Sequence, residues 1–154
     1  MLSELKKLKI NVNLGLYRDD GLGISNSTPR QIENFKKKIC TVFKNHGLNI
    51  TITANSKVVQ FLDIEMNLEE GTYKPFIKPN DSPVYVHRLS NHPPSITKNI
   101  PVAVNKRLSA RSSSQDMFDS VKGVYQESIE NSGYNFKLEY SPTSETHQQT
   151  LPQR

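Results

Sequence analysis

Two adjacent carboxylates, Asp19 and Asp20, stand between two short apolar runs in the stretch LYRDDGLGI, residues 16–24. The alternation on both sides predicts a strand, a tight turn and a second strand, with both carboxylates at the hairpin tip and Asp20-Gly21 as the turn signal. Asp and Gly tolerate left-handed backbone, so these residues could serve the turn alone. Mg²⁺, however, prefers hard oxygen ligands and is commonly held by one or two carboxylates and substrate phosphates. The hairpin tip is therefore a candidate metal site, with a plain turn as the alternative.

The composition predicts one modest, polar domain. The chain has 154 residues, of which 34% are hydrophobic, and its formal net charge is +5. A basic surplus suits nucleic-acid phosphates or an anionic membrane surface, although many soluble domains carry a charge of this size. The single Cys40 excludes an intramolecular disulfide and a Cys-rich zinc site. Without a long apolar run or a secretory signal, we expect an intracellular protein of the nucleus or the cytoplasm that does not enter the membrane.

The clearest helix follows the hairpin. Thr28-Pro29-Arg30-Gln31 is a start signal, because Thr28 can cap, Pro29 suits the first helical position and Gln31 completes a capping box. Gly47 is typical of a helix end. We expect a helix over 28–46 that covers a sheet, and a shorter one within 1–10 that needs a docking partner. The apolar face of the longer helix consists of Ile32, Phe35, Ile39, Val42 and Phe43.

Alternating residues after this helix predict strands. Residues 48–53 and 61–68 each alternate apolar with polar side chains, and residues 72–77 follow the turn signal Glu70-Gly71. We therefore expect an antiparallel meander over 48–78. Asp63 and Glu65 would share the polar face of its second strand, as solvated carboxylates or, alternatively, as part of a metal site.

An unusual loop is expected over residues 85–94, which contain His87, Arg88 and His92. The two histidines are five apart and have no third ligand at suitable spacing, so zinc is not expected. Arg88 and the histidines could contact a nucleic-acid backbone, and an ordinary hydrogen-bonded loop is the alternative.

Helical patterns dominate the remainder. Pro101 interrupts the first of them, and we expect it to begin a helix that Asn99 caps and that carries Lys106 and Arg107. A last helix is expected over 115–131, ending before Gly133. Residues 134–140 then alternate as a short extended segment would, and the composition of residues 141–154 is typical of disorder.

Four stretches, in the same order, resemble the reverse transcriptases of retroelements, closest to the Penelope-like or a related group. One is the helix over 28–46 and the strand after it, at the place of the post-catalytic helix of the family. The other three are Tyr17-Arg18-Asp19-Asp20, similar to the Tyr-x-Asp-Asp palm hairpin; Phe61-Leu62-Asp63 with Tyr73-Lys74-Pro75, similar to the Phe-Leu-Asp signature and its strand; and Ser90-Asn91-His92-Pro93, ahead of thumb-like helices.

The resemblance implies an α+β fold. Residues 1–83 would form the C-terminal half of a polymerase palm, an antiparallel hairpin and meander with a covering helix. Residues 84–140 would form a helical, thumb-like region, and residues 141–154 a disordered tail.

The resemblance also implies an RNA-directed DNA polymerase. Two Mg²⁺ or Mn²⁺ ions, with Asp19 and Asp20 as catalytic metal ligands, would activate the primer 3′-hydroxyl and stabilise the leaving pyrophosphate. The partners would be an RNA template and a DNA primer. Contacts to these nucleic acids are expected from Tyr17, Arg88, His92, Lys106 and Arg107.

One part of the family pattern is not found. These enzymes need another catalytic Asp on an earlier palm strand, and none of the sixteen residues before Tyr17 is Asp. We therefore expect a C-terminal polymerase fragment that is inactive alone. The alternatives are a non-catalytic nucleic-acid-binding remnant and a degenerate product without a selected function.

Overall fold

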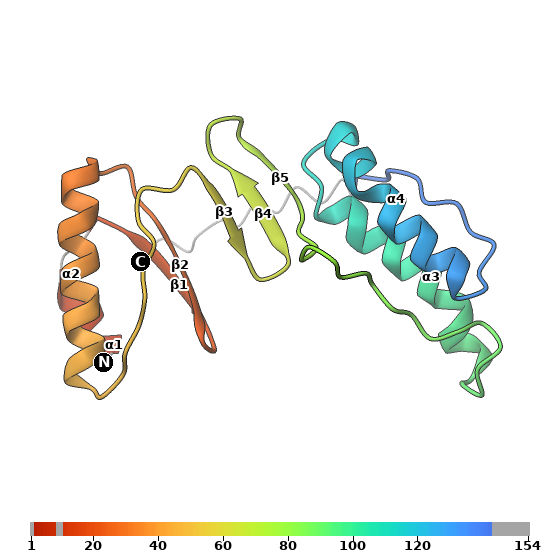
Figure 1. The fold of residues 1–154 in the computed structure, drawn as a ribbon, viewed down its shortest axis with the longest axis horizontal. Helices are drawn as coiled ribbons and strands as arrows, with labels where there is room; N and C mark the ends of the chain where they lie inside the picture. The colour runs from red at the N-terminus through yellow and green to blue at the C-terminus, as the bar shows by residue number, and fades with distance from the viewer. Residues whose placement is uncertain (1, 9–10, 143–154) are drawn as a thin grey trace, which may run out of the picture. The chain divides into compact units, whose positions relative to one another are not determined.

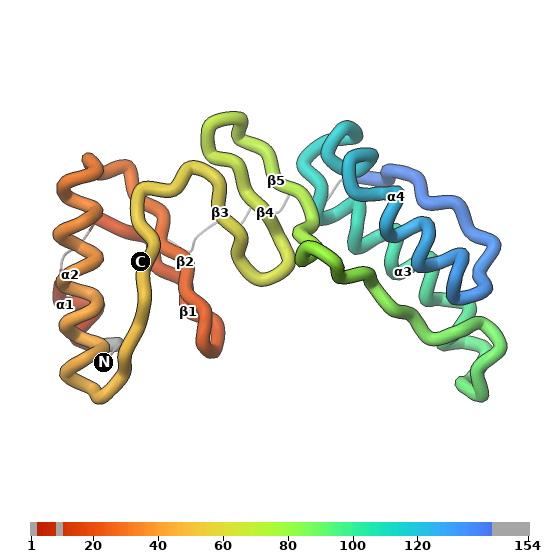
Figure 2. The backbone as a smooth tube through the Cα atoms, viewed as in Figure 1, coloured from red at the N-terminus to blue at the C-terminus, as the bar shows by residue number. Residues whose placement is uncertain are grey.

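The computed structural model describes residues 2–8 and 11–142, so most of the tail expected to be disordered lies outside the described residues. The chain divides into two compact units, Met1–Leu62 (unit 1) and Asp63–Arg154 (unit 2). The fold is α+β, with helices and small antiparallel sheets, as predicted (Figures 1 and 2). In chain order the described elements are α1 (Leu2–Lys7), β1 (Asn13–Tyr17), β2 (Asp20–Ile24), α2 (Pro29–Asn45), β3 (Val58–Phe61), β4 (Ile64–Asn67), β5 (Thr72–Pro75), α3 (Pro94–Ala110) and α4 (Gln115–Asn131).

Helix α2 begins and ends as its sequence predicts. The Thr28 hydroxyl accepts a hydrogen bond from the Gln31 amide at 3.4 Å, and Gln31 Oε1 accepts one from the Thr28 amide at 2.9 Å. This reciprocal pair is the predicted capping box, and Pro29 occupies the first turn. At the other end, Gly47 adopts a φ of 75°, which glycine tolerates better than other residues.

Unit 1 has a small core where α1 packs on α2. Leu5 of α1 is buried against the inner face of α2, and His46 Nε2 lies 3.2 Å from Glu4 Oε2. These contacts explain how a six-residue helix persists, because an isolated helix of this length is unstable in water. The buried members of this core are Leu5, Ile39, Val42 and Phe43.

The strand expected over 48–53 is not formed. Ile50 and Ile52 are half-buried and pack against the core of unit 1, while Thr51 between them is exposed. The alternation of apolar and polar residues over 48–53 therefore reflects the burial of one side of this segment. Among the described residues, no neighbouring strand pairs with it.

The single strand expected over 61–68 is also wrong, because a turn at Leu62 and Asp63 separates β3 from β4. Leu62 has a φ of 56° and is exposed. The alternation of apolar and polar residues thus continues across the turn at Leu62 and Asp63, so the pattern alone does not show where one strand ends and the next begins. Within unit 2, β4 pairs antiparallel with β5 after a turn at Gly71, as expected.

Helix α3 is continuous from Pro94 to Ala110, so the expected break at Pro101 is wrong. Pro101 lacks the N–H that would bond to the Thr97 carbonyl, at a local cost of about 3 kcal/mol. Both residues are buried, and tertiary packing of this kind outweighs the local penalty. Asn99 does not cap; its side-chain amide donates to the Ser95 carbonyl at 2.8 Å.

Helix α4 begins at the Ser114 cap, where the hydroxyl accepts from the Met117 amide at 3.3 Å, and Gly133 follows its end as predicted. The residues after Gly133 alternate between buried and exposed, which confirms the expected pattern over 134–140. Side chains of α3 and α4 satisfy amides of this segment, since Asn105 Oδ1 accepts from Glu139 N at 2.9 Å. The buried core of unit 2 comprises Leu108, Phe118, Ile129, Tyr134 and Leu138.

Thr28→Ala is expected to lower the free energy of unfolding of unit 1 by about 1 kcal/mol, because it removes the N-cap of α2. Urea unfolding followed by circular dichroism, with hydrogen exchange of the α2 amides, measures this loss. Thr41→Ala is the matched control, since Thr41 is exposed inside α2 and its hydroxyl donates to the Lys37 carbonyl of the same helix. Equal losses in the two variants would contradict the capping role.

Candidate functional site

The β1–β2 hairpin carries the two aspartates at its tip. Its two-residue turn consists of Arg18 and Asp19, so Asp20 is the first residue of β2 and pairs with Tyr17. The turn expected at Asp20-Gly21 is therefore displaced by two residues. Arg18 takes the left-handed backbone, with a φ of 50°.

Gly21 belongs to the ladder because of a close contact on one face of the hairpin. It pairs with Leu16, and a Cβ added to Gly21 would lie 3.0 Å from the Leu16 Cδ2 atom. The Leu16 side chain thus packs over Gly21, which has no side chain of its own. This packing requires Gly21 within the strand, and the turn therefore lies at Arg18 and Asp19.

The opposite face combines a carboxylate with an aromatic ring. Directly paired residues of an antiparallel sheet share a face, so Asp20 and Tyr17 lie on the same side of the hairpin. Leu22 and Ile24 follow on this side at alternate positions. Tyr17 is 52% exposed, and both aspartates are exposed as well.

The charges at the tip are not paired with one another. The Arg18 guanidinium carbon lies 5.7 Å from the centre of the Tyr17 ring, a cation–π arrangement. In the part of the chain that the structure describes, no hydrogen bond or ion pair engages the carboxylate of Asp19 or Asp20. Both groups are thus available to an external cation.

Two carboxylates fit part of a divalent-metal site. Their hard oxygen atoms suit Mg²⁺ and Mn²⁺. Within residues 2–8 and 11–142, however, no group of three His, Cys, Asp or Glu side chains could hold a metal. Asp19 and Asp20 are therefore the two candidate ligands that the hairpin itself provides.

The two other carboxylates considered for metal binding have cationic partners within unit 2. Asp63, in the turn before β4, forms an ion pair with Arg111. Glu65 of β4 lies 3.6 Å from the Lys74 ammonium on the paired strand β5. These pairs favour a structural role for both residues.

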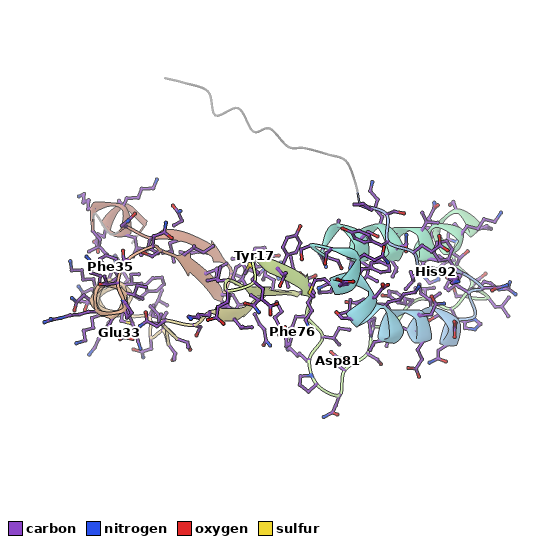
Figure 3. The ribbon with its side chains drawn as sticks, turned by 90° about the horizontal axis from the view of Figure 1, so that it is seen from above. Tyr17, Glu33, Phe35, Phe76, Asp81 and His92 are labelled. Atoms are coloured by element: carbon purple, nitrogen blue, oxygen red, sulfur yellow. The ribbon has the colours of Figure 1, made fainter. Side chains whose placement is uncertain are left out.

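The candidate nucleic-acid contacts of unit 2 lie on a loop and on α3. Arg88 and His92 are exposed in the irregular segment before α3, where Figure 3 labels His92. The His92 Nδ1 and Ser90 Oγ atoms are 3.0 Å apart, and the Arg88 amide donates to the Ser132 carbonyl at 2.9 Å. Lys106 and Arg107 are exposed on α3.

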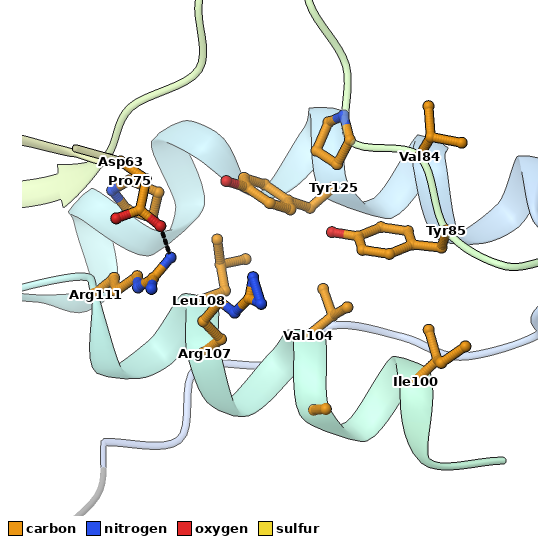
Figure 4. Close-up of a pocket in the computed structure, with 12 residues that line it drawn as sticks. Asp63, Pro75, Val84, Tyr85, Ile100, Val104, Arg107, Leu108, Arg111 and Tyr125 are labelled. Atoms are coloured by element: carbon orange, nitrogen blue, oxygen red, sulfur yellow. Dashed lines mark hydrogen bonds and ion pairs between the residues drawn. The ribbon is translucent and has the colours of Figure 1, made fainter. Parts of the chain in front are cut away.

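A pocket of about 450 Å³ within unit 2 was not expected from the sequence (Figure 4). It brings Arg107 together with Tyr85, Tyr125 and Arg111. The spacing of Arg107 and Arg111, one helical turn apart, was a detectable signal that they share a face. Nothing local connects Tyr85 with Tyr125, forty residues later.

The chain is thus an α+β protein. Unit 1 contains a hairpin with two exposed carboxylates at its tip, and unit 2 contains the packed helices α3 and α4. No family model, curated protein or solved structure matches the chain. The resemblance to reverse transcriptases therefore depends on the sequence motifs alone. In residues 2–8 and 11–142, no helix has both the length and the apolar character needed to cross a bilayer.

Proposed function

We propose that this chain is part of a retroelement reverse transcriptase, comprising the C-terminal half of the palm and the beginning of the thumb. The observation that carries the proposal is the β1–β2 hairpin, whose tip presents the exposed, unpaired carboxylates of Asp19 and Asp20. Helix α2 follows this hairpin after a short connection, at the place in the chain order where the family has its covering helix. Among the described residues, however, its buried face packs on α1, Ile50 and Ile52 and not on the hairpin.

In this proposal, Asp19 and Asp20 are metal ligands of an RNA-directed DNA polymerase. Mg²⁺ or Mn²⁺ bound there would supply Lewis-acid stabilisation to the primer 3′-oxygen and the leaving pyrophosphate. The side chains of Asp19 and Asp20 would hold this cation. Tyr17, on the same face as Asp20, is exposed and can contact the backbone of an RNA template and DNA primer.

We infer that the chain has no polymerase activity alone. Two carboxylates do not complete a two-metal centre, and the described residues bring no third ligand near them. The small sheet supports the same inference. A two-stranded hairpin is marginal by itself, and Leu16 and Ile24 leave 43% and 45% of their surface exposed. A further palm strand could pair with an edge of this hairpin and supply another carboxylate.

Primer extension on an RNA template tests the proposal. With Mg²⁺ or Mn²⁺, the chain alone should add no nucleotides. A longer product that includes the genomic sequence upstream of Met1 should extend the primer, and Asp19→Asn should abolish the extension. Asp116→Asn, which removes an exposed carboxylate at the start of α4, is the matched control. Extension by the chain alone would disprove the inferred incompleteness, and extension that survives Asp19→Asn would disprove the catalytic role.

Binding of Mn²⁺ to the isolated chain can be measured separately. We expect dissociation constants on the order of 10⁻⁴ to 10⁻³ M, since few ligands are available. Paramagnetic Mn²⁺ should broaden the amide signals of residues 18–21, and the double variant Asp19→Asn, Asp20→Asn should remove this effect. Broadening that persists in the double variant would show that the hairpin carboxylates are not the ligands.

A second candidate is a nucleic-acid-binding module without chemistry. The incomplete ligand set and the exposed Arg88, Lys106 and Arg107 favour it. Such a module would bind an RNA–DNA hybrid with strong salt dependence, because phosphate contacts release counterions. Binding that survives Asp19→Ala and Asp20→Ala, together with an inactive longer product, would favour this candidate.

A further inference from the structure

The pocket of unit 2 has an apolar floor and a polar wall. Helix α3 supplies the floor with Ile100, Val104 and Leu108, which recur at four-residue intervals along one face. Tyr85 comes from the irregular segment before α3, and Tyr125 from α4. In Figure 4 the two tyrosines lie above the floor, and the Arg107 side chain points up between them and Arg111.

Backbone contacts hold the Tyr85 wall in place. The Ser132 hydroxyl, which donates to the Ser128 carbonyl at 2.9 Å, also lies 3.3 Å from the Tyr85 carbonyl, and the Tyr134 hydroxyl donates to the Val86 carbonyl at 2.8 Å. The carbonyl groups of two consecutive residues, Tyr85 and Val86, are therefore in contact with the end of α4 and the chain after it. Because this segment is already held in place, less conformational entropy of the protein is lost when a ligand binds against it.

The pocket carries one uncompensated positive charge. Arg111 is neutralised by its ion pair with Asp63. Arg107 is exposed and has no carboxylate partner among the described residues. The formal charges of Arg107, Arg111 and Asp63 add up to +1, which suits a ligand with one negative charge.

The two tyrosines are neutral hydrogen-bond donors at neutral pH. Burial, and next the neighbouring Tyr125, raise the pKa of Tyr85 to about 12. Burial also raises the pKa of Tyr125 above its ordinary value. In the described part of the chain, no protein group accepts from either hydroxyl.

We propose that this pocket binds one unstacked nucleotide of a single-stranded nucleic acid, with the base against Tyr85 and Tyr125 and the phosphate on Arg107. A single strand carries one phosphate charge and one planar base per nucleotide, which matches one free cation beside two aromatic rings. Stacking on aromatic side chains accepts any base, so sequence preference is not required. The volume of about 450 Å³ lies within the range of small-molecule sites.

This site is separate from the hairpin carboxylates. None of its lining residues belongs to β1 or β2. The inference therefore goes beyond polymerase chemistry. It can succeed where the polymerase proposal fails, because it is tested with a different substrate and with different variants.

The test measures binding of the full chain to a fluorescein-labelled single-stranded oligonucleotide of about eight nucleotides, by fluorescence anisotropy. Arg107→Gln and Tyr85→Leu should each raise the dissociation constant roughly 5- to 100-fold, which is the effect of losing one stacking or phosphate contact. Lys98→Gln is the matched control. It removes the same charge from an exposed position of α3 outside the pocket, so an increase of at most about threefold is expected.

Competition identifies the ligand class. A diadenosine monophosphate (ApA), whose phosphodiester carries one negative charge, should displace the oligonucleotide, whereas inorganic phosphate at the same concentration should not. The proposal is overturned if the oligonucleotide does not bind, if Lys98→Gln weakens binding as much as Arg107→Gln, or if ApA does not compete. Displacement by a glutamate-rich peptide as effective as that by ApA would overturn it in favour of an acidic-peptide site. If Tyr85→Leu does not fold, the exposed Arg107→Gln carries the test.

Discussion

Replacing Phe118 by alanine is expected to lower the free energy of unfolding of unit 2 by about 3–5 kcal/mol. The Phe118 side chain is completely buried at the centre of the core of unit 2. Its ring centre lies 5.5 Å from that of Tyr140, in a tilted arrangement that adds to the stabilisation from burial. The variant loses both contributions and leaves a cavity, because the backbone of two packed helices relaxes only in part.

Urea unfolding followed by tyrosine fluorescence measures this loss, since the chain has no Trp and several tyrosines lie in unit 2. Val124→Ala is the matched control on the same helix, because Val124 is 40% exposed. It should cost less than about 1 kcal/mol. Hydrogen exchange of the α2 amides should not change, since α2 contributes to the other core. A similar loss in both variants would contradict the assignment of Phe118 to the core.

Gly133→Ala is expected to lower the free energy of unfolding by about 2–3 kcal/mol. Gly133 has a φ of 81°, and its amide donates to the Glu130 carbonyl at 2.9 Å to end α4. A left-handed backbone costs an alanine about 1–2 kcal/mol. A Cβ at this position would also lie 2.8 Å from the His87 Nε2 atom, so the imidazole must move.

A double-mutant cycle separates the two causes. His87→Ala in the Gly133→Ala background should restore about 1 kcal/mol, because it relieves the contact but not the backbone strain. Gly123→Ala is a control of opposite sign. Gly123 lies inside α4, and an added Cβ would have no neighbour within 4 Å apart from the adjacent residues and the backbone of its own helix, so alanine should stabilise the helix by about 0.5–1 kcal/mol. Thermal unfolding of all variants measures these shifts, and destabilisation by Gly123→Ala equal to that by Gly133→Ala would refute the explanation.

The position of the candidate metal site was predictable from a short stretch. Alternating residues around two carboxylates and glycines define a hairpin, and this pattern placed Asp19 and Asp20 near its tip. The turn itself differs by two residues, because Leu16 packs across Gly21 and keeps that glycine in the ladder. Local rules therefore identified the aspartates, and cross-strand packing decided which one occupies the turn.

The sequence by itself determined the elements whose signals lie within a few residues. The capping box at Thr28 and Gln31 and the stop at Gly133 are of this kind, since the interacting groups are neighbours along the chain. Tertiary structure decided the rest. It kept α3 continuous through the buried Pro101, and it left Ile50 packed on a helix instead of in a strand. It alone brought Tyr85, Arg107 and Tyr125 to one pocket, because contacts between distant residues depend on packing that no local pattern encodes.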